Sequence, residues 1–210
     1  MEELNKLIDG YKRFHDNYFE GDKALFEQLS QGQAPSTLVI ACSDSRVDPA
    51  IIMDCKPGDL FVIRNVASLV PPYETGGLYH GVSAALEFGV RALNVRHIIV
   101  LGHQYCGGIN ALFNGADGIE GSEFIQPWVN MATEARERVL KEMATATKSE
   151  QLCACEKAGV LVSLNNLLTF SWIKQRVEQG DLMLHGWYFN IDGGILSAYD
   201  QAADEFKPLV

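Results

Sequence analysis

Two kinds of hydrophobic pattern alternate along the chain. Short continuous apolar runs, bounded by Gly, Pro and Asp, predict buried strands. Longer stretches with apolar residues three and four positions apart predict amphipathic helices. The predicted strands are 37–42, 60–63, 95–101 and 183–191, and the predicted helices are 3–30, 49–53, 77–93, 107–112, 127–144 and 150–179.

This alternation predicts an α/β fold with a mainly parallel central sheet flanked by helices, because parallel strands need crossover connections. A break at Gly21-Asp22 divides the helical pattern before the first strand. That N-terminal helical arm, residues 1–30, has two possible roles. It either covers its own sheet or lies across a neighbouring subunit, and the pattern favours neither.

Length and charge narrow the class of protein. A chain of 210 residues predicts one domain, 1–210, with a sizeable core. The net charge of −10 disfavours a nucleic-acid partner. The start, Met-Glu-Glu-Leu-Asn-Lys, lacks the pattern of a signal peptide, and no apolar run reaches the roughly 18 residues of a membrane span. We therefore expect a cytoplasmic protein without membrane contact, whose five cysteines are reduced.

The residues with distinctive chemistry follow two of the predicted strands. One strand leads into Ala41-Cys42-Ser43-Asp44-Ser45-Arg46, and another leads into Gly102-His103-Gln104-Tyr105-Cys106-Gly107-Gly108. Ligands of parallel sheets lie beyond the carboxyl ends of strands, near the point where strand order reverses. We expect the two segments to meet there. Two thiolates and one imidazole are the donors that zinc takes when its fourth position stays open.

The fourth position has alternative occupants. Asp44 either fills it or orients a zinc-bound water, with Arg46 holding the carboxylate in a bidentate pair. A closed structural zinc site would instead use Cys55, Cys153 or Cys155. Against the closed site, a C-x-C pair within an apolar helix is typical of buried core thiols.

These segments resemble the two signatures of the β-class carbonic anhydrases. The resemblance covers residues 30–197 and places a catalytic core at 31–197. It rests on the following matches: Cys42-Ser43-Asp44-Ser45-Arg46-Val47, Gly58-Asp59-Leu60-Phe61, Arg64-Asn65-Val66-Ala67, Ser83-Ala84-Ala85-Leu86-Glu87-Phe88, Gly102-His103-x-x-Cys106-Gly107-Gly108 and His185-Gly186-Trp187.

The resemblance implies a lyase that reversibly hydrates CO₂ to bicarbonate and a proton by zinc-bound hydroxide. It implies one Zn²⁺ per subunit, held by Cys42, His103 and Cys106, with Asp44 and Arg46 as the catalytic dyad. It also implies a homodimer or a tetramer built as a dimer of dimers. The pocket then lies at the dimer interface, and the N-terminal arm lies on the partner subunit.

The resemblance further implies a set of substrate-binding residues. Gln33 matches a glutamine that donates to substrate across the interface, and Phe61 and Val66 match apolar wall positions. Phe88 stands where the plant enzymes have tyrosine, so the hydroxyl is lost. Gly107 offers a backbone N–H at a helix start, which suits a developing bicarbonate oxygen.

A position beside the first ligand predicts the subclass. Some bacterial members bind bicarbonate at a noncatalytic site that locks the counterpart of Asp44 onto zinc, and that site needs a Trp where this chain has Val39. We therefore expect the bacterial-type, open-site subclass, with Asp44 off the metal near neutral pH. Two thiolates leave zinc formally neutral, which predicts an alkaline activity profile. His80 and His97 are candidate proton shuttles.

Two rival functions use the same residues. The first is hydrolysis of a CO₂ analogue, COS or CS₂, at the same zinc site. The second is a zinc-binding protein without turnover. An intact Asp44–Arg46 pair argues against the second, because a structural zinc site needs neither side chain.

Overall fold

The computed structural model describes residues 2–21, 23–77, 79–115 and 122–210. The chain divides into two compact units, Met1–Ala34 and Pro35–Val210. The first unit contains α1 (Glu2–His15), the π-helical turn η1 (Asp16–Gly21) and α2 (Lys23–Leu29). The predicted helical arm is therefore confirmed. Of the predicted break, Gly21 ends η1, and Asp22 lies outside the described residues.

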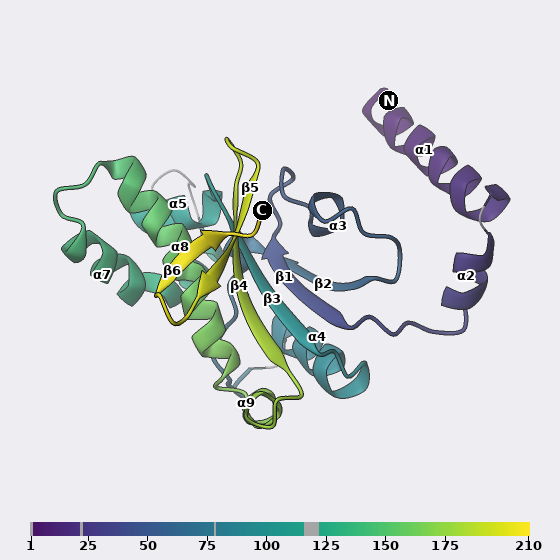
Figure 1. Cartoon of the computed structure of the whole chain (residues 1–210). Coiled ribbons are helices and arrows are strands. Elements are labelled where there is room, and N and C mark those ends of the chain that lie inside the picture. Colours follow the sequence, from purple (N-terminus) through teal and green to yellow (C-terminus); the bar gives the residue numbers. More distant parts are fainter. Residues whose placement is uncertain (1, 22, 78, 116–121) are drawn as a thin grey trace. The chain divides into compact units, whose positions relative to one another are not determined.

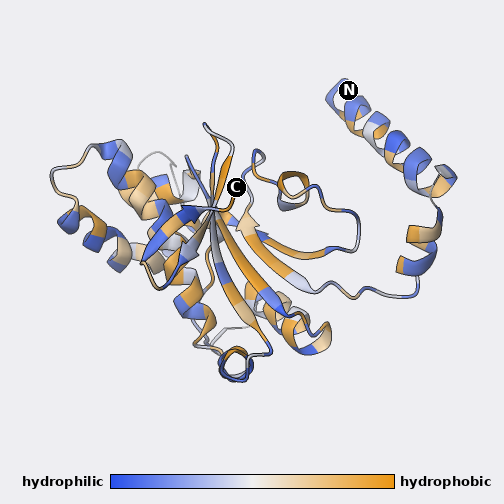
Figure 2. Ribbon diagram, in the orientation of Figure 1, coloured by the Kyte–Doolittle hydropathy of each residue, from blue (hydrophilic) through white to orange (hydrophobic). Residues whose placement is uncertain are grey.

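Hydrophobic residues alternate with hydrophilic ones along helix α1 (Figure 2), and their spacing forms an apolar stripe on one side of the helix. Leu4, Leu7, Ile8 and Tyr11 are spaced three and four residues apart, and all are more than half exposed. Burial of such a stripe is the usual source of stability for an amphipathic helix. The stripe is therefore a surface suited to contact with another element or subunit.

The second unit is built on a six-stranded sheet in the order β2-β1-β3-β4-β5-β6 (Figure 1). The first four strands are parallel to one another, and β5 and β6 run antiparallel. The mainly parallel sheet is thus confirmed, whereas β5 and β6 were not predicted. The strands are β1 (Thr37–Cys42), β2 (Leu60–Asn65), β3 (His97–His103), β4 (Met183–Asn190), β5 (Ile195–Asp200) and β6 (Glu205–Pro208).

The helices of this unit depart from the predicted ranges at several ends. The helix expected from residue 77 begins at Gly81, and the stretch 150–179 is interrupted at Leu168–Phe170, where the Phe170 ring is buried. None of the described helices combines the length and apolar character needed to cross a membrane. The helical elements are α3 (Pro49–Ile52), η2 (Val66–Ser68), α4 (Gly81–Glu87), η3 (Phe88–Ala92), α5 (Gly107–Asn114), α6 (Ile125–Val129), η5 (Asn130–Ala132), α7 (Thr133–Glu142), α8 (Lys148–Leu167) and α9 (Ser171–Glu178).

Helix α8 packs closely against the middle of the sheet, because two strands present glycine to it (Figure 1). A Cβ on Gly102 would lie 2.5 Å from Val160 Cγ2, and one on Gly186 would lie 3.0 Å from Val160 Cγ1. Neither position has room for a side chain. Because these two glycines have no side chain, α8 can pack directly against the carboxyl end of β3.

The sheet order brings the two predicted ligand segments together. β1 pairs with β2 on one side and with β3 on the other, so the strand order reverses between β1 and β3. Cys42 is the last residue of β1, and His103 is the last residue of β3. Both therefore lie at the switch point, where ligands of parallel sheets bind.

Candidate metal centre

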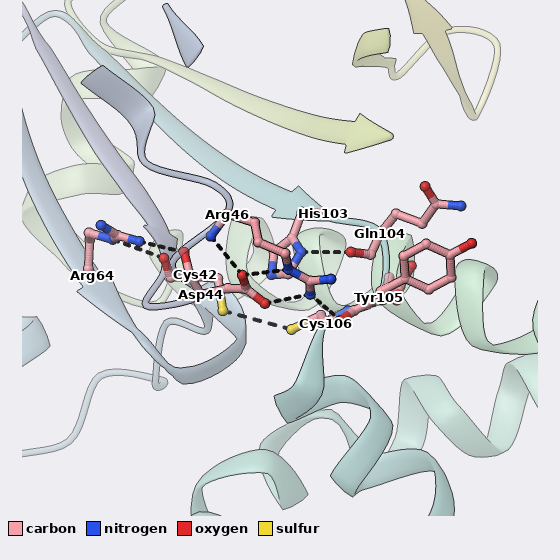
Figure 3. Close-up of polar contacts among 9 residues, drawn as sticks. Cys42, Asp44, Arg46, Arg64, His103, Gln104, Tyr105 and Cys106 are labelled. Atoms are coloured by element: carbon pink, nitrogen blue, oxygen red, sulfur yellow. Dashed lines mark hydrogen bonds and ion pairs between the residues drawn. The ribbon is translucent and has the colours of Figure 1, made fainter. Parts of the chain in front are cut away.

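Three donors gather at this edge of the sheet (Figure 3). The Sγ atoms of Cys42 and Cys106 are 3.9 Å apart, and the donor atoms of Cys42, His103 and Cys106 all lie within 4.8 Å of one another. All three residues are buried, with at most 5% exposure. Across the described chain this is the one such group of three or more His, Cys, Asp or Glu residues. Cys55, Cys153 and Cys155 are not part of this group, which argues against a closed zinc site built with one of them.

The donor set suits Zn²⁺. His103 Nδ1–H donates a hydrogen bond to the carbonyl oxygen of Gln104 at 2.8 Å. The other ring nitrogen, Nε2, is buried and has no hydrogen-bond partner among the described residues. A buried nitrogen without a partner is costly unless a ligand occupies it. One such nitrogen and two sulfurs match the preference of zinc for imidazole and thiolate.

The two sulfurs differ in acidity because they contact each other. That contact, with a smaller contribution from nearby His103, lowers the pKa of Cys42 to about 4 against the effect of burial. The same contact and burial raise the pKa of Cys106. Burial alone would lower the pKa of His103, but the adjacent Cys42 raises it overall. The pair thus carries one ready thiolate, and a divalent cation would displace the proton from the second.

Asp44 and Arg46 form a bidentate pair beside the three donors (Figure 3). Arg46 Nε donates to Asp44 Oδ1 at 2.9 Å, and Arg46 Nη2 donates to Oδ2 at 2.7 Å. The Arg46 backbone N–H adds a third hydrogen bond to Oδ1 at 3.0 Å. The Arg46 side chain thereby holds the pKa of Asp44 well below its usual range. Asp44 is engaged by Arg46 and does not belong to the three-donor group.

Arg64, which sequence reasoning did not assign to the site, holds the first ligand segment by its backbone. Its Nε donates to the carbonyl of Cys42 at 3.0 Å, and its Nη2 donates to the carbonyl of Asp44 at 2.7 Å. Asp48 accepts from Nη1 at 2.8 Å. An Arg within a strand gave no signal of this role beyond its place in the matched motif.

Asp192, in the β4–β5 turn, holds the second ligand segment. Its Oδ2 accepts from Tyr105 Oη at 2.6 Å and from Gln104 Nε2 at 3.0 Å. Tyr105 has a φ of 60°, an uncommon conformation for a residue other than glycine, and its carbonyl accepts from Arg46 at 3.1 Å. Sequence reasoning missed both Asp192 and Tyr105, because 87 residues separate them.

The predicted pocket residues of the second unit form two groups. The rings of Phe61 and Phe88 are 5.8 Å apart, with Phe88 about half exposed. Val66 adjoins the start of α5, because a Cβ on Gly108 would lie 2.6 Å from Val66 Cγ1. Gly107 has open space where its Cβ would be, with nothing within 4 Å. The space beside the Gly107 backbone is thus free for a small ligand.

The remaining candidates lie elsewhere. Gln33 belongs to the first unit, so its role across an interface stays a prediction. His80 lines a hollow of about 570 Å³ together with Val66, and within the described ranges its Nε2 is buried without a partner. His97 begins β3, which His103 ends, so about 20 Å of strand separate them. His97 Nδ1 instead lies 3.1 Å from His185 Nε2, within hydrogen-bond distance. At the opposite end of β3 from His103, His97 is too far from the metal centre to relay a proton directly.

Comparison with known proteins identifies the family. The family model described as carbonic anhydrase matches residues 37–196. The chain is 40% identical over 204 residues to a carbonic anhydrase of Synechocystis sp., an alignment that covers 97% of this chain and 73% of that protein. The solved β-carbonic anhydrase CcaA superposes with a TM-score of 0.93 at 37% identity, covering 100% of this chain and 93% of that one.

A second solved structure shares the fold at lower identity. It is one of two tetrameric β-carbonic anhydrases from the fungus Sordaria macrospora, with a TM-score of 0.84 and 27% identity, covering 94% of this chain and 97% of that one. The matched region contains the three clustered donors and the Asp44–Arg46 pair. This chain therefore belongs to the β-class carbonic anhydrases, a family of lyase enzymes.

Proposed function

We propose that this protein uses one zinc ion per subunit to hydrate CO₂ reversibly to bicarbonate and a proton. The observation that carries the proposal is the buried Cys42–His103–Cys106 group beside the Asp44–Arg46 pair. Cys42, His103 and Cys106 would hold the ion, which would supply the Lewis acidity that activates water toward CO₂.

Asp44 serves as a fixed hydrogen-bond acceptor in this scheme. Because Arg46 holds its pKa well below the usual range, the carboxylate stays ionised at neutral pH. It therefore accepts a hydrogen bond from the attacking water and orients the oxygen lone pair toward CO₂. Such a weak base does not keep the product proton, so that proton leaves through another group or through solvent.

The pocket residues supply a dry surface and a place for negative charge. Phe61, Val66 and Phe88 present apolar groups, which suit CO₂ because it is small and carries no charge. Gly107 is the first residue of α5, so its backbone N–H lies at the helix N-terminus, where the helix dipole favours an anion. We assign it to the oxygen of CO₂ that becomes negative as bicarbonate forms.

Assembly and compartment complete the proposal. The relatives from Sordaria macrospora are described as tetrameric, and a homodimer or dimer of dimers is proposed for this chain. The exposed stripe of α1 would lie on the partner subunit, with Gln33 donating to substrate across the interface. The proposed compartment is the cytoplasm, a reducing environment in which the five free cysteines would stay reduced.

Stopped-flow CO₂ hydration at pH 7 and pH 8.5, with zinc measured on the same sample, tests the proposal. We expect about one zinc per chain and turnover that is faster at the higher pH. Asp44→Ala should keep zinc and fold but lose most activity. Full zinc without turnover at either pH would refute the proposal, and turnover of CS₂ in its place would favour the hydrolase alternative.

A further inference from the structure

A buried carboxylate lies behind the metal centre. Glu156, on α8, is 3% exposed and stands among apolar neighbours on the buried face of the helix. Its Oε1 accepts from the backbone N–H of Cys106 at 3.0 Å, and its Oε2 accepts from Tyr188 Oη at 2.7 Å. Both carboxylate oxygens are thus satisfied, by a ligand residue on one side and by β4 on the other.

Glu156 has no ion-pair partner in the part of the chain that the structure describes. The ammonium of neighbouring Lys157 instead lies 5.2 Å from the centre of the Tyr188 ring. A carboxylate buried without a cation is expensive for the fold. Simple packing does not account for Glu156, because an apolar residue of similar size would avoid that cost. Its hydrogen bonds lead instead to the backbone of a metal-ligand candidate.

The contact acts where the backbone of the ligand segment changes direction. Cys106 has an extended backbone at the N-cap of α5, and its own side chain makes no capping hydrogen bond. The residue before it, Tyr105, has a positive φ. The Cys106 N–H therefore points away from the helix and needs an acceptor, which Glu156 supplies. Fixing this amide fixes the direction in which the Cys106 thiol leaves the backbone.

We propose that Glu156, oriented by Tyr188, is a positioning residue that fixes the Cys106 backbone and so aims its thiolate at Cys42 and His103. The inference rests on the proposed zinc site. Partners of this kind, one step removed from the metal, commonly control affinity tenfold to a hundredfold. Glu156 thereby links the longest helix of the second unit to the geometry of the donors.

The test compares zinc affinity, measured by competition with a chromogenic chelator, across matched variants of the full chain. Glu156→Ala removes the acceptor, whereas Glu156→Gln keeps an amide oxygen for the Cys106 N–H. We expect zinc affinity to fall at least tenfold in Glu156→Ala and to stay within about threefold of the parent in Glu156→Gln. Tyr188→Phe should fall between the two, because the carboxylate remains but loses its orienting hydroxyl.

The control is Thr147→Ala. Thr147 caps α8, so its loss destabilises the same helix without touching the ligand segment. Cobalt substitution gives a second readout, since the thiolate-to-cobalt absorption bands respond to the position of Cys106. They should change in Glu156→Ala and Tyr188→Phe and stay unchanged in Thr147→Ala.

Two results overturn the inference. The first is equal zinc affinity in Glu156→Ala and Glu156→Gln. The second is a Tyr188→Phe variant whose zinc affinity and cobalt spectrum both match those of Thr147→Ala. This second result decides the question if Glu156→Ala does not fold. A parent protein that binds no zinc would instead refute the proposed function, so the two failures are distinguishable.

Discussion

Adjacent glycines at the start of α5 should respond oppositely to the same substitution. A Cβ on Gly108 would lie 2.6 Å from Val66 Cγ1, 2.9 Å from Ala67 Cβ and 3.3 Å from Ala67 N. Valine is stiff at χ1, and the Ala67 Cβ is fixed to the backbone, so neither atom yields easily. Overpacking of this kind costs about 1–3 kcal/mol, while alanine regains up to about 1 kcal/mol of helix propensity.

Two of the three contacts lie below 3.0 Å, so we place the overpacking cost at about 2–3 kcal/mol. After subtraction of about 1 kcal/mol of regained helix propensity, Gly108→Ala should destabilise the fold by about 1–2 kcal/mol. For a chain of this size that corresponds to a melting temperature about 2–8 °C lower. Gly107→Ala meets nothing within 4 Å, so it should be neutral or stabilise by up to about 1 kcal/mol.

Denaturant unfolding at one fixed protein and zinc concentration measures both variants, since assembly and metal also shift stability. Gly108→Ala should additionally reduce turnover, because displacing Ala67 moves a backbone N–H that acts on Cys42. The reasoning about close approach would be refuted by a Gly108→Ala protein as stable as the parent.

Three further predictions follow from the contacts of the site. In Arg46→Gln the pKa of Asp44 should rise toward its ordinary value, because the Arg46 hydrogen bonds that lower it are lost. The free energy of unfolding of the parent should exceed that of Arg46→Gln by its full amount above the ordinary carboxyl pKa of about 4, and this difference should shrink as the pH falls below it. A difference that stays the same at acid pH would contradict this. Asp192→Ala should lower kcat, because Gln104 and Tyr105 lose their shared acceptor, whereas Asp200→Ala on β5 should not; equal kcat values for the two variants would count against the argument. Removal of zinc by a chelator should lower the melting temperature, and zinc at a hundred times its Kd should restore about 2.7 kcal/mol with release of protons, as calorimetry in two buffers can measure. An unchanged melting temperature would show that the metal does not support the fold.

The strands nearest the site could be predicted because they are buried, and buried strands consist of continuous apolar residues. The run at 37–42 is buried along nearly its whole length, and the end of β3 is equally buried. Continuous apolar runs of this kind indicate parallel strands covered on both faces. Because ligand sites of parallel sheets lie at the switch point between adjacent strands, the sequence also predicts that Cys42, His103 and Cys106 lie close together.

The antiparallel edge of the sheet gave no comparable signal. β5 and β6 are short and mostly half-buried or exposed, so their apolar pattern is weak. The pairing of β5 with β4 and of β6 with β5 is a tertiary contact that local propensity does not encode. The break at Leu168–Phe170 was missed for a related reason, because apolar residues on both sides continue the helical period.

The sequence itself marks Glu156 as unusual. Glu156 shares a helical face with Val160, Ser163 and Leu167, all essentially buried, so a charge there breaks the amphipathic pattern. A charged residue at a core position indicates either an ion pair or a function. The pattern alone identifies the anomaly, but its partner Cys106 is 50 residues away and becomes visible only in the fold.

The anchors around the centre share one property that explains how the donors keep their geometry. Arg64 donates to the carbonyls of Cys42 and Asp44, and Glu156 accepts from the amide of Cys106. Each contact fixes the backbone rather than the donor side chain, so the sulfur atoms remain free to point at the centre. These anchors lie on β2, which pairs with β1 along its whole length, and on α8, which packs against β3 and β4. The direction of each donor is therefore set by the fold.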